Sequence, residues 1–71
     1  MRDKRLETLS INIKAERVRK KLTQSQLAQL TNVSERSISQ IEQSKQTPSA
    51  LVIFDIAKAL GITVDELYKG L

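Results

Sequence analysis

Residues 35–43 carry the side chains best suited to chemistry, and that chemistry is hydrogen bonding rather than catalysis. On a helical wheel of about 100° per residue, Ile38, Ile41 and Glu42 face one way, toward an expected core. The other polar side chains face outward or flank the outer face: Glu35, Arg36, Ser39, Gln40 and Gln43. A merely solvated helix usually alternates Lys and Glu, whereas these residue types can address the base edges of duplex DNA.

The outward side chains differ in the base that each could read. Arg36 can donate two hydrogen bonds to guanine and Gln40 can pair with adenine, each contact being worth roughly 1–3 kcal/mol of discrimination. Glu35 could accept from a cytosine amino group, but the helix dipole alone also favours a carboxylate at this place. Ser39 suits more than one base. Arg36 could instead contact only phosphate, so its role is open at this point.

Composition excludes most enzyme chemistry. The chain of 71 residues has no histidine and no cysteine, so the usual general base and thiolate nucleophile are missing. Its eight carboxylates are scattered without metal-ligand spacing, and we expect neither catalysis nor a metal or cofactor. The lack of cysteine fits a reducing compartment, and the longest apolar run, residues 50–54, is too short to span a bilayer. These features predict a cytoplasmic protein.

The net charge of +4 comes from the first part of the chain, where residues 1–45 hold ten Lys and Arg against five Asp and Glu. Such a basic half suits nucleic acid or an anionic membrane surface, although ordinary solubilising charge gives the same count. With one Tyr, one Phe and no Trp, the chain offers no stacking platform for single strands. Double-stranded DNA is therefore the expected partner. Residues 1–5 are predicted to form a basic arm that either contacts DNA or lacks fixed structure.

Two short amphipathic segments must position the outer face, and they meet across a turn within residues 24–43. Thr23 is a suitable N-cap and Gln26 completes a capping box, which predicts a first helix over residues 24–31. Free backbone N–H groups in its first turn make Gln24 a place for a phosphate.

The turn after that helix has its own signals. Asn32 stands where a left-handed residue is expected, and asparagine tolerates that conformation better than most residues. Val33 is expected to plug the turn into the core, and Ser34 to cap the second helix over residues 35–43.

A preceding helix over residues 6–21 is predicted from an apolar stripe with one charged member. The stripe consists of Leu6, Leu9, Ile13 and Arg17. A cation on an apolar face needs an acceptor, because an unpaired buried charge is very costly. Glu42 faces inward on its own helix, so we expect Arg17 and Glu42 to form a partly buried ion pair.

Two further helices follow the motif. Pro48 is expected at the first position of a helix that stops before Gly61, and Thr63 with Glu66 forms a capping box for a short helix that Gly70 ends. On the wheel, one inward arc holds Ala50, Ile53, Phe54, Ile56, Ala57 and Leu60. Four apolar residues remain outside the expected core and either form part of a subunit contact or are singly exposed: Leu51, Val52, Tyr68 and Leu71.

Several of these features together resemble the Cro/repressor-type helix-turn-helix domain of phage repressors and many bacterial regulators. The resemblance covers residues 13–67 and rests on "LTQSQLA", the Val33 plug, Ile38 and Ile41 with Glu42, Pro48, and "IAKALGITVDEL". It implies an all-α, five-helix, lambda-repressor-like fold over residues 1–71. In that family the second helix of the motif enters the major groove, and an Arg–Glu pair joins the first and third helices.

The resemblance also implies specific contact positions. Base reading would fall on Glu35, Arg36, Ser39 and Gln40, and phosphate contact on Thr23, Gln24, Ser37, Gln43 and Lys45. Asn32 and Ser44 stand where the family most often has glycine, so a left-handed conformation there would cost about 1 kcal/mol.

The implied function is that of a sequence-specific transcriptional regulator, most simply a repressor. A domain of this size covers few base pairs, so we expect a homodimer on an inverted repeat with half-sites about 34 Å apart. Contact with RNA polymerase would instead make it an activator. The competing hypothesis is a protein-binding module, such as an antitoxin that grips a toxin through Leu51, Val52 or the C-terminal end.

Overall fold

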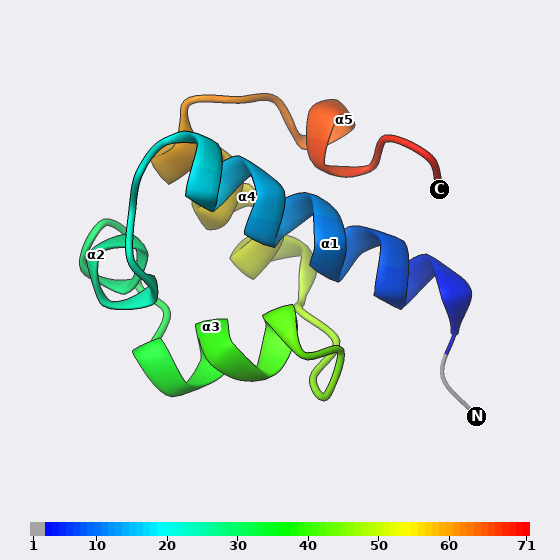
Figure 1. The fold of residues 1–71 in the computed structure, drawn as a ribbon, viewed down its shortest axis with the longest axis horizontal. Helices are drawn as coiled ribbons and strands as arrows, with labels where there is room; N and C mark the ends of the chain where they lie inside the picture. The colour runs from blue at the N-terminus through cyan, green and yellow to red at the C-terminus, as the bar shows by residue number, and fades with distance from the viewer. Residues whose placement is uncertain (1–2) are drawn as a thin grey trace.

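The computed structural model describes residues 3–71, and within them the chain forms five α-helices and no strand. The helices are α1 (Lys4–Arg19), α2 (Gln24–Gln29), α3 (Glu35–Glu42), α4 (Ala50–Leu60) and α5 (Val64–Leu67). In Figure 1, α1 crosses the middle of the molecule, with α3 on one side and α5 on the other. The all-α, five-helix architecture predicted from the sequence is confirmed. No helix within residues 3–71 is both long and apolar enough to cross a membrane.

Every helix contributes to a single core. Ile13 of α1, Leu27 of α2, Ile38 of α3, Ile56 of α4 and Leu67 of α5 are all fully buried. Since each fully buried side chain of this size stabilises the fold by roughly 1.5–3 kcal/mol, no helix could dissociate without a large loss. The prediction that Ile38 and Ile41 face the core is thus confirmed.

The start of α1 departs from the predicted arm. The helix begins at Lys4 rather than Leu6, because the Asp3 carboxylate caps it by accepting from the Arg5 amide at 2.9 Å. The Arg5 guanidinium also donates to that carboxylate at 2.7 Å. These hydrogen bonds from Arg5 lower the pKa of Asp3 to about 2. Of the predicted arm, residues 3–5 therefore belong to the helix start, while residues 1–2 lie outside the described part.

The two caps of the motif are confirmed, but the turn is closed differently. Thr23 forms the predicted capping box with Gln26, and the Ser34 hydroxyl accepts from the amide of Ser37 at 3.1 Å. The first motif helix ends at Gln29, two residues early.

Asn32 does not adopt the left-handed conformation, so that prediction is wrong. Instead, the Thr31 hydroxyl accepts from the Val33 amide at 3.1 Å and donates to the Ala28 carbonyl at 3.1 Å. These bonds let the chain turn with ordinary φ angles. Val33 is buried, as predicted. Within residues 3–71, the non-glycine residues with positive φ are Lys21 and Ser44, each at 59°.

The α4 helix begins two residues after Pro48, so the prediction of proline at its first position is wrong. Ser49 caps it by accepting from the Val52 amide at 3.2 Å, and Pro48 is buried just before the cap. The helix ends at Gly61, whose φ of 70° suits glycine. The predicted inward arc is wrong at Ala50 and Phe54, which are exposed. Both lie in the first half of α4, where Ile53 is buried and Val52 packs against the core partly.

The capping box of α5 is present as predicted: the Thr63 hydroxyl accepts from the Glu66 amide at 3.1 Å. The helix ends at Leu67, three residues before the predicted stop at Gly70. The side-chain amide of Asn12 in α1 donates to the carbonyls of Leu67 and Lys69, both at 2.8 Å. The C-terminal end is therefore tied to α1.

Candidate nucleic-acid interface

The α3 helix is mounted by its inward face and leaves its polar face outside. Ile38 and Ile41 have no exposed surface, and the Ser34 cap fixes the first turn. Ser10 of α1 adds a buried tie, because its hydroxyl donates to the Ile41 carbonyl at 2.6 Å. In Figure 1, α3 lies at the edge of the molecule, on the side of α1 opposite α5. A rigid, outward-facing helix of this kind can be docked into a groove.

The Arg17–Glu42 ion pair predicted from the sequence is present. Arg17 donates from Nε to Glu42 Oε2 at 2.7 Å and from Nη2 to Oε1 at 3.0 Å. Its remaining Nη1 donates to the Leu22 carbonyl at 2.7 Å. The side chains are only 11% and 3% exposed, and the hydrogen bonds that Arg17 donates to Glu42 raise the pKa of Arg17. The pair is therefore bidentate, charged and nearly dry, and it ties α1 to α3.

Gln24 joins this network from α2. Its Nε2 donates to Glu42 Oε1 at 3.2 Å, so its side chain is turned toward the network. The sequence predicted that Gln24 would contact a phosphate. In the structure its side chain links α2 to α3 through the hydrogen bond to Glu42. A sequence pattern shows no sign of this contact, because the two residues are 18 positions apart.

On the outer face of α3, the four predicted base-reading residues are not equally accessible. Glu35 and Arg36 at its N-terminal end are exposed, whereas Ser39 and Gln40 are half-buried. Gln43 at the C-terminal cap donates from Nε2 to the Ser39 hydroxyl oxygen at 3.0 Å. The sequence analysis missed this bond, although a spacing of four residues on a helix is the signal for it.

The predicted phosphate-contacting residues differ in their exposure. Thr23 and Lys45 are exposed, and Ser37 is half-buried beneath its cap. Lys45 follows Ser44, whose left-handed φ of 59° turns the chain so that the Lys45 amide donates to the Gln40 carbonyl at 2.8 Å. The glycine-like conformation expected at Ser44 is thus adopted.

The four apolar residues predicted to remain outside the core divide into two groups. Leu51, Tyr68 and Leu71 are 77%, 41% and 49% exposed, whereas Val52 is half-buried and packs against the core. Val52 lies outside the core arc on an ideal wheel. In the structure α4 contacts α1 and α2, and Val52 packs partly against the core. Ile11, Val18 and Leu30 are also exposed, as is Phe54, which was predicted to face the core.

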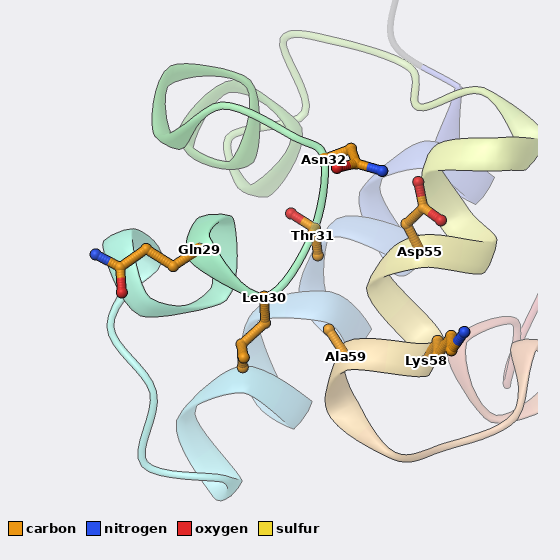
Figure 2. Close-up of a pocket in the computed structure, with 7 residues that line it drawn as sticks. All are labelled: Gln29, Leu30, Thr31, Asn32, Asp55, Lys58 and Ala59. Atoms are coloured by element: carbon orange, nitrogen blue, oxygen red, sulfur yellow. The ribbon is translucent and has the colours of Figure 1, made fainter.

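A groove separates the end of α2 and the motif turn from α4 (Figure 2). Asn32 and Asp55 point toward one another across it, and Gln29 points away. Leu30, Thr31, Lys58 and Ala59 complete the lining. Within residues 3–71 there is no group of three or more His, Cys, Asp or Glu that could hold a metal ion.

A family model described as helix-turn-helix matches residues 13–67 of the chain. The chain belongs to this family. Its members are DNA-binding regulators of the Cro/repressor type rather than enzymes. The match includes the N-caps of α2 to α5, the ion pair and the whole of α3.

A similar protein is also a regulator. The immunity repressor protein of Bacillus phage phi105 is 40% identical over 60 residues, which cover 84% of this chain and 42% of that protein. The chain thus matches less than half the length of this curated relative.

Solved structures of the helix-turn-helix family have the same fold. The restriction-modification controller protein C.Esp1396I, solved as a point mutant, has a TM-score of 0.90 at 28% identity, over 97% of this chain and 87% of that chain. The controller protein C.AhdI from Aeromonas hydrophila has a TM-score of 0.85 at 27% identity, over 87% and 94%. The clp gene regulator ClgR from C. glutamicum has a TM-score of 0.82 at 26% identity, over 87% and 80%.

Proposed function

We propose that this protein is a sequence-specific transcriptional repressor that places α3 in the major groove of double-stranded DNA. The observation that carries the proposal is the polar outer face of α3, held rigid by a dry ion pair to α1 and by its buried isoleucines. The similar proteins include an immunity repressor and two restriction-modification controllers, which supports a regulatory role. A regulator of this kind acts where DNA is, which supports a cytoplasmic location.

In this proposal the N-terminal half of α3 reads bases. Arg36 is exposed and donates its guanidinium fork to guanine O6 and N7, while Gln40 pairs with adenine. Glu35 accepts from a cytosine amino group, and Ser39 contacts the adjacent base pair.

Phosphates are bound by residues at the edges of the motif. The proposed contacts are Thr23, Gln24, Ser37, Gln43 and Lys45. Because the Gln24 side chain also bonds Glu42, a phosphate at that place would be held by a group already fixed to the recognition helix. If each of two subunits neutralises about three phosphates, log affinity falls against log salt with a slope near −5.

The proposed assembly is a homodimer on an inverted repeat. Leu51, Tyr68 and Leu71 supply exposed apolar surface for the subunit contact, and Phe54 lies one helical turn from Leu51 on the same face of α4. Val52 contributes less, because it packs partly against its own core. The same exposed residues would serve an antitoxin that grips a toxin, or a contact with RNA polymerase, so the assembly needs its own test.

Selection of duplexes from a random pool, at a stated salt concentration, tests both the reading of bases and the dimer. The expected product is an inverted repeat with half-sites about 34 Å apart, bound by two chains in sedimentation analysis. Recovery of no common sequence would refute base reading. A monomer both free and on the selected duplex would refute the dimer.

A further inference from the structure

The hydrogen bond between Gln43 and Ser39 links one residue proposed to bind phosphate with one proposed to read a base. Gln43 Nε2 is the donor and Ser39 Oγ the acceptor, at 3.0 Å. The two residues are four positions apart, one at the cap of α3 and the other a turn earlier. The Ser39 side chain therefore meets DNA already hydrogen-bonded on one side.

This bond limits what the Ser39 hydroxyl can do next. A serine hydroxyl has one proton to donate and two lone pairs to accept with, and the Gln43 amide occupies one lone pair. Within residues 3–71 no group accepts the hydroxyl proton of Ser39, whereas Thr8 and Thr31 donate theirs to backbone carbonyls. The hydroxyl therefore keeps its proton and one lone pair for a ligand, and because accepting the amide proton of Gln43 polarises the O–H bond, the donor role is the stronger of the two.

We propose that Gln43 is a specificity-determining residue that sets the polarity of Ser39, so that Ser39 reads a hydrogen-bond acceptor on a base edge. In the major groove the acceptors are guanine O6 and N7, adenine N7 and thymine O4, whereas the amino groups of cytosine and adenine are donors. With its proton directed outward, Ser39 favours base pairs that present an acceptor at its position. This inference rests on the proposed function, since it assumes that α3 lies in the major groove.

The alternative is that Gln43 only contacts phosphate, as expected from the sequence. A neutral amide on a phosphate would change affinity equally for all sequences, because phosphates carry no base information. A polarity-setting Gln43 would change the preference at the one base pair that Ser39 contacts. The two roles therefore differ in base preference, not in total affinity.

The test compares selected base preferences of the full chain with those of single and double variants. Ser39→Ala identifies the base pair that Ser39 reads. Gln43→Met removes the hydrogen bond while keeping the length of the side chain, and we expect it to reduce the acceptor preference at that pair by about 2- to 10-fold, the worth of one hydrogen bond. The double variant should show no further reduction. Gln29→Met, at an exposed glutamine of α2, is the matched control and should leave the preference unchanged.

The variant Gln43→Glu tests whether Gln43 decides if Ser39 donates to the base or accepts from it. A carboxylate can only accept, so Ser39 would donate to it and present lone pairs outward. The preference at the same base pair should then move toward those with an amino group facing Ser39, while the added negative charge lowers affinity for all duplexes. Circular dichroism of each variant establishes that α3 is folded.

If Gln43→Met lowers the affinity for all duplexes equally and keeps the base preferences of the original chain, the polarity role is overturned. The proposed function is unaffected by that result. An unchanged preference in Gln43→Glu would overturn the polarity role as well. If the unmodified chain selects no common sequence, the proposed function fails and the polarity role fails with it.

Discussion

Replacing Arg17 by methionine should remove a large fraction of the free energy of unfolding of this protein. Methionine keeps an unbranched side chain of similar length but removes three hydrogen bonds, two to Glu42 and one to the Leu22 carbonyl. Glu42, with a side chain 3% exposed, would keep only its bond from Gln24. Breaking a buried pair from one side typically costs about 3–5 kcal/mol, against a total of roughly 4–11 kcal/mol for a domain of this size.

Urea unfolding followed by circular dichroism, at one fixed protein concentration, measures this loss. The matched control is Arg19→Met, because Arg19 pairs with Glu16 three residues earlier while 59% exposed, and such pairs contribute about 1 kcal/mol or less. Arg17→Met combined with Glu42→Leu removes both charges and should be more stable than Arg17→Met alone. A loss for Arg17→Met no greater than that for Arg19→Met would refute the view that the pair is dry and holds α3 in place.

Other predictions address binding, backbone strain and pH. Arg36→Ala should weaken binding to the selected duplex by about 10- to 100-fold and relax one base position, as measured by fluorescence anisotropy; equal weakening on random DNA would restrict Arg36 to phosphate. Lys21→Gly should stabilise the fold by about 0.5–1 kcal/mol in urea unfolding, because its φ of 59° favours glycine, whereas Asn32→Gly, at ordinary φ, should destabilise it. Asp3 has a pKa of about 2 in the folded chain, below its usual 3.8, so its support of the α1 start is complete above pH 4 and is lost as the pH falls toward 2. An NMR titration checks this, and Arg5→Ala should return the pKa toward 3.8; an unchanged pKa would contradict the assigned cause.

The parts of the fold that local signals encode were predictable from the sequence. The caps at Thr23, Ser34 and Thr63 were predictable because a capping hydroxyl and its partner lie within three residues of each other. The Arg17–Glu42 pair followed from two amphipathic faces, each with one charge that needed a partner.

The errors fall where packing decides between local options. Nine of the eleven residues at positions 50–60 are apolar, so a wheel alone cannot say which are covered when α1 and α2 approach α4. The motif turn was predicted with a left-handed Asn32. That conformation is unnecessary because the Thr31 hydroxyl accepts a hydrogen bond from the Val33 amide and donates one to the Ala28 carbonyl.

The residue types of the candidate site were readable, and their hydrogen-bond partners were not. Gln24 was expected beside a phosphate, but its bond to Glu42 depends on how α2 meets α3. A wheel likewise places Ser39 and Gln43 near each other without showing which of them donates.

The central claim is that the outer face of α3 meets the bases of duplex DNA, and NMR titration of the labelled protein with its selected duplex tests it most directly. The largest amide shifts, together with intermolecular contacts to base protons, are expected from residues 35–40. Residues 55–59 of α4, along the groove of Figure 2, should change little. Contacts confined to α4 and α5, with α3 unchanged, would contradict the account.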